Sequence, residues 1–226
     1  MAALGEMAAG IAHEINNPLS IIIARIWHIK ALIRKGGLTD YDKINSNLDI
    51  IENTAEHIAT IVKGMRSISR DSATDPFITT NIATIIEQTL VFCRERFKNN
   101  YINLIIEIPP KEINISCHPA QIGQIILNLL NNSFDAVNVL QEKWVRLEIK
   151  ENKSYVEIQI TDSGKGIPIE YQARLTQPFF TTKPPGKGTG LGLSISQVIA
   201  EAHHGEIYLD KESKNTRFVL KLPKLP

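Results

Sequence analysis

The chain lacks most of the features that mark secreted, membrane-spanning or nucleic-acid-binding proteins. Among its 226 residues there are only two cysteines, Cys93 and Cys117, and they stand in no spaced motif. A disulfide framework is therefore excluded, and both are expected to be buried thiols in a reducing compartment. No run of 18 apolar residues occurs, so no segment is expected to span a membrane. The net charge of +1 indicates neither nucleic-acid binding nor contact with an anionic membrane.

Other familiar signals are missing as well. The N-terminus has neither the basic start nor the cleavage site of a signal peptide, and there are no internal repeats or low-complexity tracts. A Walker-type phosphate loop and an Asp-Phe-Gly motif are also absent. These absences favour a cytoplasmic segment. Because the chain begins inside a helix signature, we expect a fragment from which an upstream portion has been removed.

A long helix is predicted for residues 4–34, with His13 as its chemically distinctive residue. Apolar residues recur there at steps of three and four, which is typical of helices that pack side by side. At about 100° per residue, His13 lies roughly opposite this apolar seam, on the same face as Asn17. Pro18 cannot donate a hydrogen bond to the carbonyl of Glu14, so the helix should bend there. The seam consists of Leu4, Ala8, Ile11, Ile15, Leu19, Ile22, Ile26, Ile29 and Ile33.

A second helix is predicted after a short loop. Gly36 and Gly37 end the first helix, and Thr39 is a suitable N-cap for the second. The two helices form an antiparallel hairpin, which alone buries too little apolar surface to be stable. We therefore expect a homodimer through residues 4–70, held by a four-helix bundle; the alternative is a hairpin packed on the chain's own second domain. The second seam consists of Ile44, Leu48, Ile51, Ala55, Ile58, Val62 and Met65.

The pattern changes at residues 71–76, a polar segment that ends in proline and is typical of a linker. The predicted domains are a helical hairpin at 1–70 and a second domain at 77–226. Helices alternate with antiparallel strand pairs in the second domain, which indicates an α+β sandwich: a mixed sheet with helices on one face. Its expected helices are residues 81–98, 119–140 and 193–203. Its expected strands are residues 77–80, 103–108, 113–117, 145–150, 155–161, 207–210 and 217–222.

Two polar clusters of the second domain suit a metal–nucleotide complex. Asn128 and Asn132 share one helical face, with Asp135 close by, and amide oxygens are hard ligands suited to Mg²⁺. Asp162 follows a strand, where its carboxylate could accept a hydrogen bond from an exocyclic amine such as that of adenine. The glycines after it allow close backbone approach to a flat ligand. Taken alone, each pattern is equally consistent with solvated asparagines or a glycine turn.

Two further clusters follow towards the C-terminus. Residues 178–183 (PFFTTK) join an apolar anchor to hydroxyl donors and a cation. Residues 186–193 (GKGTGLGL) run directly into a helix. Alternate glycines expose backbone N–H groups, and the helix N-terminus adds partial positive charge; both suit phosphates. The intervening Pro-Pro-Gly favours a mobile lid.

With these motifs in this order, the sequence resembles the catalytic core of bacterial two-component sensor histidine kinases, in the subgroup that includes nitrogen-regulation kinases. GIAHEINNPL matches the family's phosphoacceptor box. The asparagine helix, DSGKGIP, PFFTTK and GKGTGLGL match its nucleotide boxes. The resemblance implies an ATP-binding domain of the type shared with gyrase and chaperone ATPases, with ATP and Mg²⁺ bound. It also implies a homodimer and a response regulator receiver domain as partner.

The resemblance further implies a role for each site residue. His13 would accept the γ-phosphoryl group of ATP, with Glu14 as its base or orienting acceptor. Asn17 would align the water that dephosphorylates the partner regulator. Asn132 would bind Mg²⁺, and Asp162 would read adenine. The implied nucleotide-binding residues are Asn128, Asn132, Asp135, Asp162, Gly164, Gly166, Ile167, Phe180, Thr181, Thr182, Lys183, Lys187, Gly188, Thr189, Gly190, Leu191, Gly192 and Leu193.

The sequence departs from the family's pattern at two positions. His118 stands before Pro119 where an aspartate is usual, so the acidic cap of the asparagine helix is missing and the stability of its first turn is in doubt. Ser133 replaces the usual alanine after Asn132, which is a small change.

Two other functions are compatible with parts of the sequence. A related ATPase would hydrolyse ATP with a glutamate four residues before its magnesium-binding asparagine, but that position is Asn128, which cannot act as a base. A dimeric scaffold or regulator phosphatase could bind ATP without using it. The input signal, the cognate regulator, and the choice between phosphorylation within one chain or across a dimer stay open.

Overall fold

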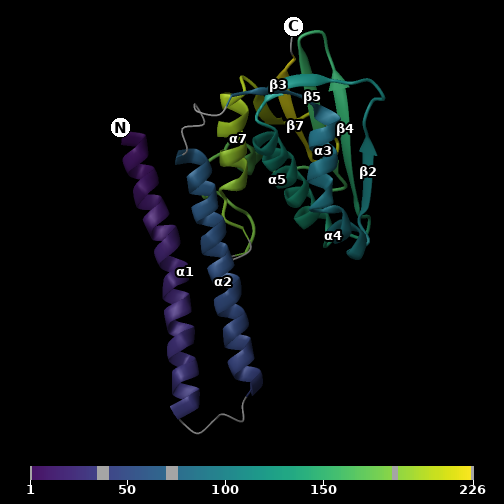
Figure 1. The fold of residues 1–226 in the computed structure, drawn as a ribbon. Helices are drawn as coiled ribbons and strands as arrows, with labels where there is room; N and C mark the ends of the chain where they lie inside the picture. The colour runs from purple at the N-terminus through teal and green to yellow at the C-terminus, as the bar shows by residue number, and fades with distance from the viewer. Residues whose placement is uncertain (1, 35–40, 70–75, 185–187, 225–226) are drawn as a thin grey trace. The chain divides into compact units, whose positions relative to one another are not determined.

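The structure is a computed structural model that describes residues 2–34, 41–69, 76–184 and 188–224 (Figure 1). The chain divides into two compact units, one made of residues 1–69 with 181–189, the other of residues 70–180 with 190–226. The predicted linker, except Pro76, lies outside the described residues, so the predicted domain boundaries stay predictions. No helix within the described ranges has the length and apolar character needed to cross a membrane.

The first unit contains the predicted helical hairpin. Helix α1 spans Ala2–Arg34 and continues through Pro18, and helix α2 spans Tyr41–Ser69 beside it (Figure 1). One turn around the proline gains a side-chain hydrogen bond, because the Ser20 hydroxyl donates to the Asn16 carbonyl at 2.9 Å. The expected stop at Gly36–Gly37 and the expected cap at Thr39 lie outside the described residues.

Part of the predicted seam forms the contact between the two helices. Ile22 and Ile29 of α1 are half-buried, as are Ile44 and Ile51 of α2. A polar pair lies among them: Asn47 is buried, and its Oδ1 accepts a 3.4 Å hydrogen bond from the Arg25 guanidinium. The described part of the hairpin is thus held by apolar contacts around one polar link.

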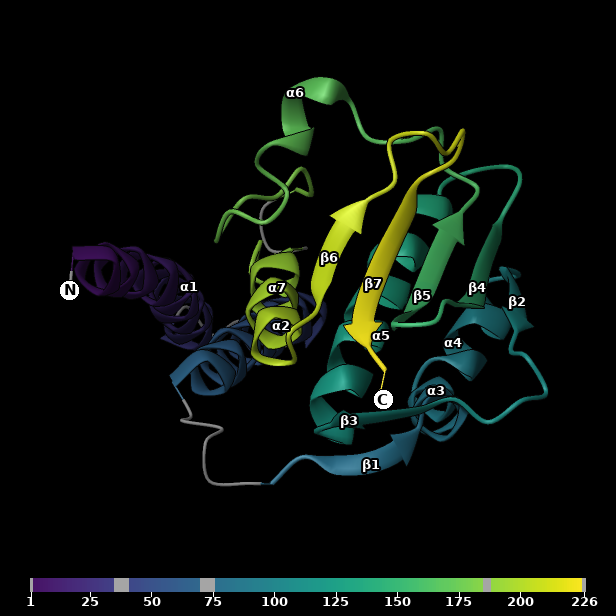
Figure 2. The same ribbon diagram turned by 90° about the horizontal axis from the view of Figure 1, so that it is seen from above.

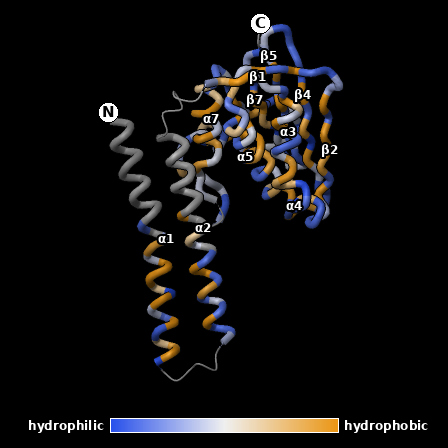
Figure 3. Tube along the Cα trace, viewed as in Figure 1, coloured by the Kyte–Doolittle hydropathy of each residue, from blue (hydrophilic) through white to orange (hydrophobic). Residues whose placement is uncertain are grey.

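The rest of the predicted seam stays exposed. Leu19, Ile26, Ile33 and Leu48 are 37–48% exposed, and apolar residues are frequent along the described part of α1 (Figure 3). The expectation of a single apolar seam is therefore corrected, because it divides into one row inside the hairpin and a second row on its surface. A second apolar row needs a second packing partner if it is to leave water.

The second unit contains the predicted mixed sheet. Its five strands run in the order β2-β4-β5-β7-β6, with β2 parallel to β4 and the other neighbours antiparallel. A separate antiparallel pair is formed by β1 and β3. The strands are β1 Ile78–Asn81, β2 Asn103–Glu107, β3 Asn114–Cys117, β4 Trp144–Glu151, β5 Tyr155–Asp162, β6 Glu206–Leu209 and β7 Arg217–Pro223.

Helices cover one face of this sheet, as predicted. The central helix α5 packs on β4 and β5, α7 packs on β6 and β7, and α3 packs on α5 (Figure 2). The helices are α3 Ile82–Val91, α4 Arg94–Asn99, α5 Pro119–Val137, α6 Ile169–Gln172 and α7 Gly192–Ala202. The short helix α6 was not predicted, because it has no apolar periodicity of its own.

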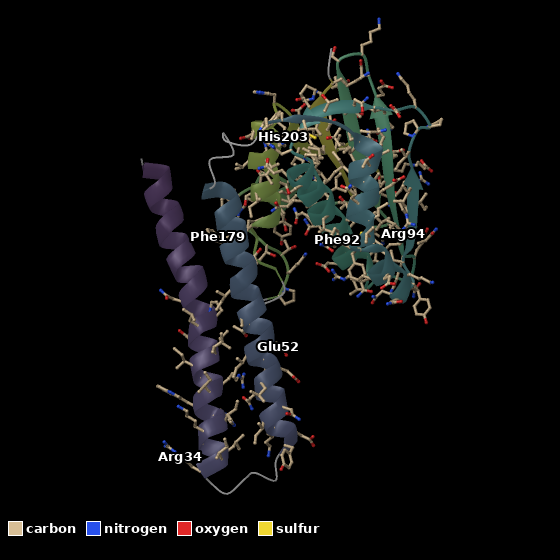
Figure 4. All side chains as sticks on the ribbon, in the orientation of Figure 1. Arg34, Glu52, Phe92, Arg94, Phe179 and His203 are labelled. Atoms are coloured by element: carbon tan, nitrogen blue, oxygen red, sulfur yellow. The ribbon has the colours of Figure 1, made fainter. Side chains whose placement is uncertain are left out.

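The predicted helix 81–98 is wrong as a single element. It breaks between α3 and α4, where the N–H groups of Phe92 and Cys93 bond to carbonyls three residues back, those of Thr89 and Leu90. The ladder of bonds to the fourth residue back is lost, and Phe92 is left 78% exposed (labelled in Figure 4). The predicted Asn81 cap is confirmed, since its Oδ1 accepts the Ala83 N–H at 3.0 Å.

The core lies between α5, α3 and the sheet. The residues predicted to face inward from α3 and α4 are all buried, and alternate residues of β4 and β5 meet the apolar face of α5. The buried face of α5 consists of Ile122, Ile125, Ile126, Leu129, Leu130, Ser133, Phe134 and Val137. This packing fixes which face of α5 remains for the asparagines.

Three rings compensate for the missing acidic cap of α5. His118 is the N-cap and makes no side-chain cap hydrogen bond. Its backbone N–H donates instead to Nε2 of His203, at 3.0 Å, and Nδ1 of His203 lies 2.8 Å from the Ile199 carbonyl. The proton must therefore be on Nδ1. Phe77 stacks on His203 with a 4.8 Å centroid separation, and burial lowers the pKa of this imidazole.

We expect His203→Phe to destabilise the second unit by about 2–3 kcal/mol, because two buried polar groups lose their partner. The wild-type unfolding free energy should also fall as the pH drops below about 6.5, because the unfolded chain then binds a proton that the folded His203 binds less readily. Urea unfolding followed by Trp144 fluorescence in a Trp27→Phe background would measure both effects. The exposed neighbour His204 provides the control, and an equal loss in His204→Gln would contradict this assignment.

Candidate functional site

Helix α5 presents its asparagines opposite its apolar face. Because the buried residues recur at steps of three and four, Asn128 and Asn132 are left half-exposed on the other side. The Asn128 Nδ2 donates to the Ser196 hydroxyl of α7 at 3.0 Å. Asn128 is thereby oriented, with Oδ1 directed at the first turn of α7.

The start of α7 approaches this asparagine closely. A Cβ on Gly192 would lie 2.3 Å from Asn128 Oδ1, so only glycine fits. The N-cap Leu191 makes no side-chain cap hydrogen bond, which leaves backbone N–H groups of the first turn for another acceptor. An uncapped helix N-terminus beside two amides suits phosphate oxygens.

Asp162 closes strand β5 as a buried carboxyl, only 3% exposed. Its backbone N–H donates to the Thr216 carbonyl at 2.9 Å, which ties it to the start of β7. Its Oδ1 accepts the Gly164 N–H at 2.8 Å, and the hydroxyls of Thr216 and Ser133 also donate to the carboxyl. Burial raises the pKa of Asp162, and these three donors oppose that shift.

The loop after Asp162 is held in place through one carbonyl. The Gly164 carbonyl accepts the Thr216 N–H at 3.2 Å and the Asn215 amide at 3.1 Å. A Cβ on Gly164 would lie 2.7 Å from Asp162 Oδ1, which explains the glycine. The half-buried Ile167 follows, and its carbonyl accepts the Gln172 amide at 2.9 Å.

A tight contact joins the two flanks of the glycine-rich segment. Phe179, labelled in Figure 4, has a φ of 66°. Gly190 also has a positive φ, and a Cβ there would lie 2.3 Å from the Phe179 carbonyl carbon. Phe180 beside it is covered by Arg174, whose guanidinium carbon lies 4.4 Å from the ring centroid. This cation was not predicted.

Several predicted residues lie in the segment that groups with the first unit. Within it, a Cβ on Gly188 would lie 2.8 Å from Thr181 Oγ1, and the Lys183 N–H donates to the same oxygen at 3.1 Å. The nucleotide roles predicted for Thr181, Thr182, Lys183, Gly188 and Thr189 stay predictions. Lys187 lies outside the described residues.

The side chains of the predicted phosphoacceptor box are not described either. The backbone of His13, Glu14 and Asn17 belongs to α1. The orientation predicted for their side chains stays a prediction.

Asp135 has a partner that the sequence did not indicate. Its carboxylate pairs with Arg96 of α4 at 3.3 Å, while the same guanidinium donates to Asn131 at 3.1 Å and lies 3.9 Å from the Phe134 ring centroid. Both charged side chains are partly exposed, so the pair contributes less than about 1 kcal/mol. It links α4 to α5, and the nucleotide role of Asp135 stays a prediction.

The donor set fits a magnesium ion shared with a nucleotide. Within the described residues, no group of three or more His, Cys, Asp or Glu side chains could hold a metal ion alone. A hard cation bound through Asn132 would therefore need phosphate oxygens and waters as its remaining ligands, which is the usual arrangement for Mg²⁺.

The structure thus brings together three of the four predicted clusters of the second domain. Asn128, Asp162 and Gly192 meet where α5, the end of β5 and the start of α7 come together. Sequence reasoning missed Thr216 as a partner of Asp162 and recorded Ser133 only as a departure. The pattern around Thr216, a lone hydroxyl before the last strand, carries no recognisable motif.

The chain matches two family models. Residues 3–74 match the His Kinase A (phospho-acceptor) domain. Residues 117–226 match the Histidine kinase-, DNA gyrase B-, and HSP90-like ATPase.

Curated relatives match almost the whole chain. The two-component sensor PprA of Pseudomonas aeruginosa is 31% identical over 99% of the chain, and sporulation kinase E of Bacillus subtilis is 31% identical over 97%. The sensor histidine kinase ZraS of Escherichia coli is 29% identical over 99%. The chain spans only 24%, 28% and 46% of these three proteins, respectively. The predicted nitrogen-regulation subgroup stays a prediction.

Solved structures match in the same way. The histidine kinase ThkA in complex with response regulator protein TrrA has a TM-score of 0.80 and 28% identity, over 100% of this chain and 63% of that one. The catalytic domain of ThkA alone has a TM-score of 0.59 and 27% identity, over 67% of this chain and 100% of that one.

We expect Gly190→Ala to weaken nucleotide binding by about tenfold or more, because the new Cβ would displace the Phe179 backbone beside the start of α7. Gly166→Ala is the matched variant: it also places alanine at a positive φ, of 87°, but its Cβ meets no atom within 4 Å. Titration with a fluorescent ATP analogue would compare them. Equal losses in both variants would show that the contact with Phe179 is unimportant.

Proposed function

The chain belongs to the family of two-component sensor histidine kinases, and we propose that it transfers the γ-phosphoryl group of ATP to His13 and then to an aspartate of a response regulator. The observation that best supports this is the meeting of Asp162, the asparagine helix and the first turn of α7 in one unit. Each provides one part of a nucleotide site.

The parts correspond to the parts of ATP. The buried Asp162 carboxylate is an acceptor suited to the adenine amino group, and Gly164 permits close approach beside it. The uncapped N-terminus of α7 suits the phosphates, with Asn128 next to it. Asn132 would hold Mg²⁺, which neutralises charge on the phosphates when bound.

Phosphoryl transfer itself needs positioning more than covalent assistance. A free imidazole has a pKa of about 6.5, so His13 would be a neutral nucleophile near pH 7. One of its ring nitrogens forms a bond to the γ-phosphorus, the bond from that phosphorus to the β–γ bridging oxygen breaks, and ADP leaves with the electron pair. Glu14 would orient the ring and accept its proton.

The product would serve as an intermediate donor. A nitrogen–phosphorus bond is labile, which suits onward transfer to a carboxylate on a second protein. ThkA is known in complex with the response regulator protein TrrA, and we infer a receiver domain as the partner of this chain too. Asn17, one turn from His13 on α1, would align water for dephosphorylating that regulator.

Hydrolysis of ATP is the rival that residue chemistry disfavours. Its general base would have to stand four residues before Asn132, but Asn128 carries an amide there. That amide is already engaged with Ser196. An amide does not accept a proton near neutral pH, so it cannot activate water.

We expect His13→Gln to reduce labelling from γ-labelled ATP at least about 100-fold while ATP affinity is unchanged, because the nucleophile is lost and the nucleotide site is kept. The wild-type label should be acid-labile and base-stable. Asp162→Asn should show the reverse pattern, with weaker ATP binding. Asn17→Ala should keep labelling but slow the loss of phosphate from the regulator. Wild-type levels of acid-labile label in His13→Gln would refute the assignment.

The exposed apolar row on the hairpin supports a homodimer. Leu19, Ile26 and Ile33 follow one another at steps of seven on α1, and Leu48 of α2 is exposed with them. We expect sedimentation equilibrium to give twice the 25.3 kDa chain mass. Ile26→Glu should raise the dimer dissociation constant at least about tenfold, because it buries an unpaired charge. The exposed Lys30 is the control, and a monomeric wild type would contradict the proposal.

A further inference from the structure

The Asp162 carboxyl has a hydroxyl partner on the asparagine helix. We propose that Ser133 is a positioning residue for base selection: its hydroxyl holds the Asp162 carboxylate as an acceptor, which favours adenine over guanine. The inference rests on the proposed function, because it concerns how the same nucleotide site distinguishes its base.

Burial makes this contact consequential. Ser133 and Asp162 are each only 3% exposed, and α5 packs directly on β5. Water cannot replace a lost partner at such a site, so every donor to the carboxylate has to come from the protein or the ligand. The donors from the protein are the Gly164 N–H and the hydroxyls of Thr216 and Ser133.

The three donors come from three different elements. Gly164 lies in the loop after β5, Thr216 precedes β7, and Ser133 lies on α5. A carboxylate has about four lone-pair positions, so three donors leave one direction for the ligand. With the plane of the carboxylate set in this way, the remaining direction accepts an N–H and has no proton to give.

That arrangement distinguishes the two purines. Adenine presents an exocyclic amino group, which donates to a carboxylate. Guanine presents a keto oxygen at the same ring position, which would face the carboxylate as a second acceptor and be repelled. Without the Ser133 hydroxyl, the carboxylate can rotate or keep a proton, and either change reduces the preference for an amino group.

The competing explanation is that Ser133 only fills space between α5 and β5. Its replacement would then lower stability and affect all nucleotides alike. The selectivity between ATP and GTP separates the two explanations, because a packing change has no means of distinguishing an amino group from a keto oxygen.

The experiment uses the full chain and displacement of a fluorescent ATP analogue by ATP or GTP. We expect Ser133→Ala to weaken ATP binding about tenfold with GTP binding changed less than about threefold, so that the ATP-to-GTP affinity ratio falls. The maximal rate of His13 labelling at saturating ATP should change less than about twofold, because the phosphate side of the site is untouched.

Two further variants make the result specific. Ser133→Thr keeps the hydroxyl and should retain most of the wild-type ratio; it also provides the reading if the alanine variant does not fold. Thr89→Val removes a buried hydroxyl of α3 that donates to the Ile85 carbonyl at 2.8 Å, remote from the nucleotide site, and should leave the ratio unchanged.

The outcomes are distinguishable. Equal losses for ATP and GTP in Ser133→Ala, unchanged binding of both, or a ratio in a folded Ser133→Thr as low as in Ser133→Ala, would overturn the role of Ser133. Failure of the wild-type chain to bind ATP at all would instead overturn the proposed function.

Discussion

The nucleotide-binding unit depends on one buried carboxylate and the donors that make its burial tolerable. Asp162 loses its hydration under α5, and its carboxyl is compensated by the Gly164 N–H and two hydroxyls. These donors reach it only because β7 lies beside β5 and α5 crosses both β4 and β5. The order of strands and the packing of the central helix are therefore conditions for the site as well as for stability.

Close backbone approach is the second constraint, and it explains the glycines that matter. Gly192 has to admit the Asn128 amide, and Gly190 has to admit the Phe179 carbonyl. Any side chain at these positions would push the start of α7 away from α5. The same absence of Cβ atoms leaves the first turn of α7 open to a phosphate, so packing and ligand access place the same demand on the sequence.

The helical hairpin follows a different logic. Its two helices share apolar contacts around the Arg25–Asn47 hydrogen bond, but a second apolar row of α1 remains exposed. A hairpin that satisfies only half of its apolar surface is suited to association, and a histidine on its α1 helix is suited to interaction with other domains. Stability and signalling thus use opposite faces of one short element.

Local chemistry made much of this predictable. Apolar periodicity predicted both long helices and the mixed sheet with its helices on one face, and the glycine and asparagine motifs identified the nucleotide boxes, because such signals depend on residues close together in the chain. The break between α3 and α4, the support of His118 by His203, and the Arg96–Asp135 pair were missed. So was the hydroxyl of Ser133 against Asp162. Those contacts join residues far apart in sequence or depend on a turn's exact bonding, and only tertiary packing determines which polar groups are buried together and must satisfy one another.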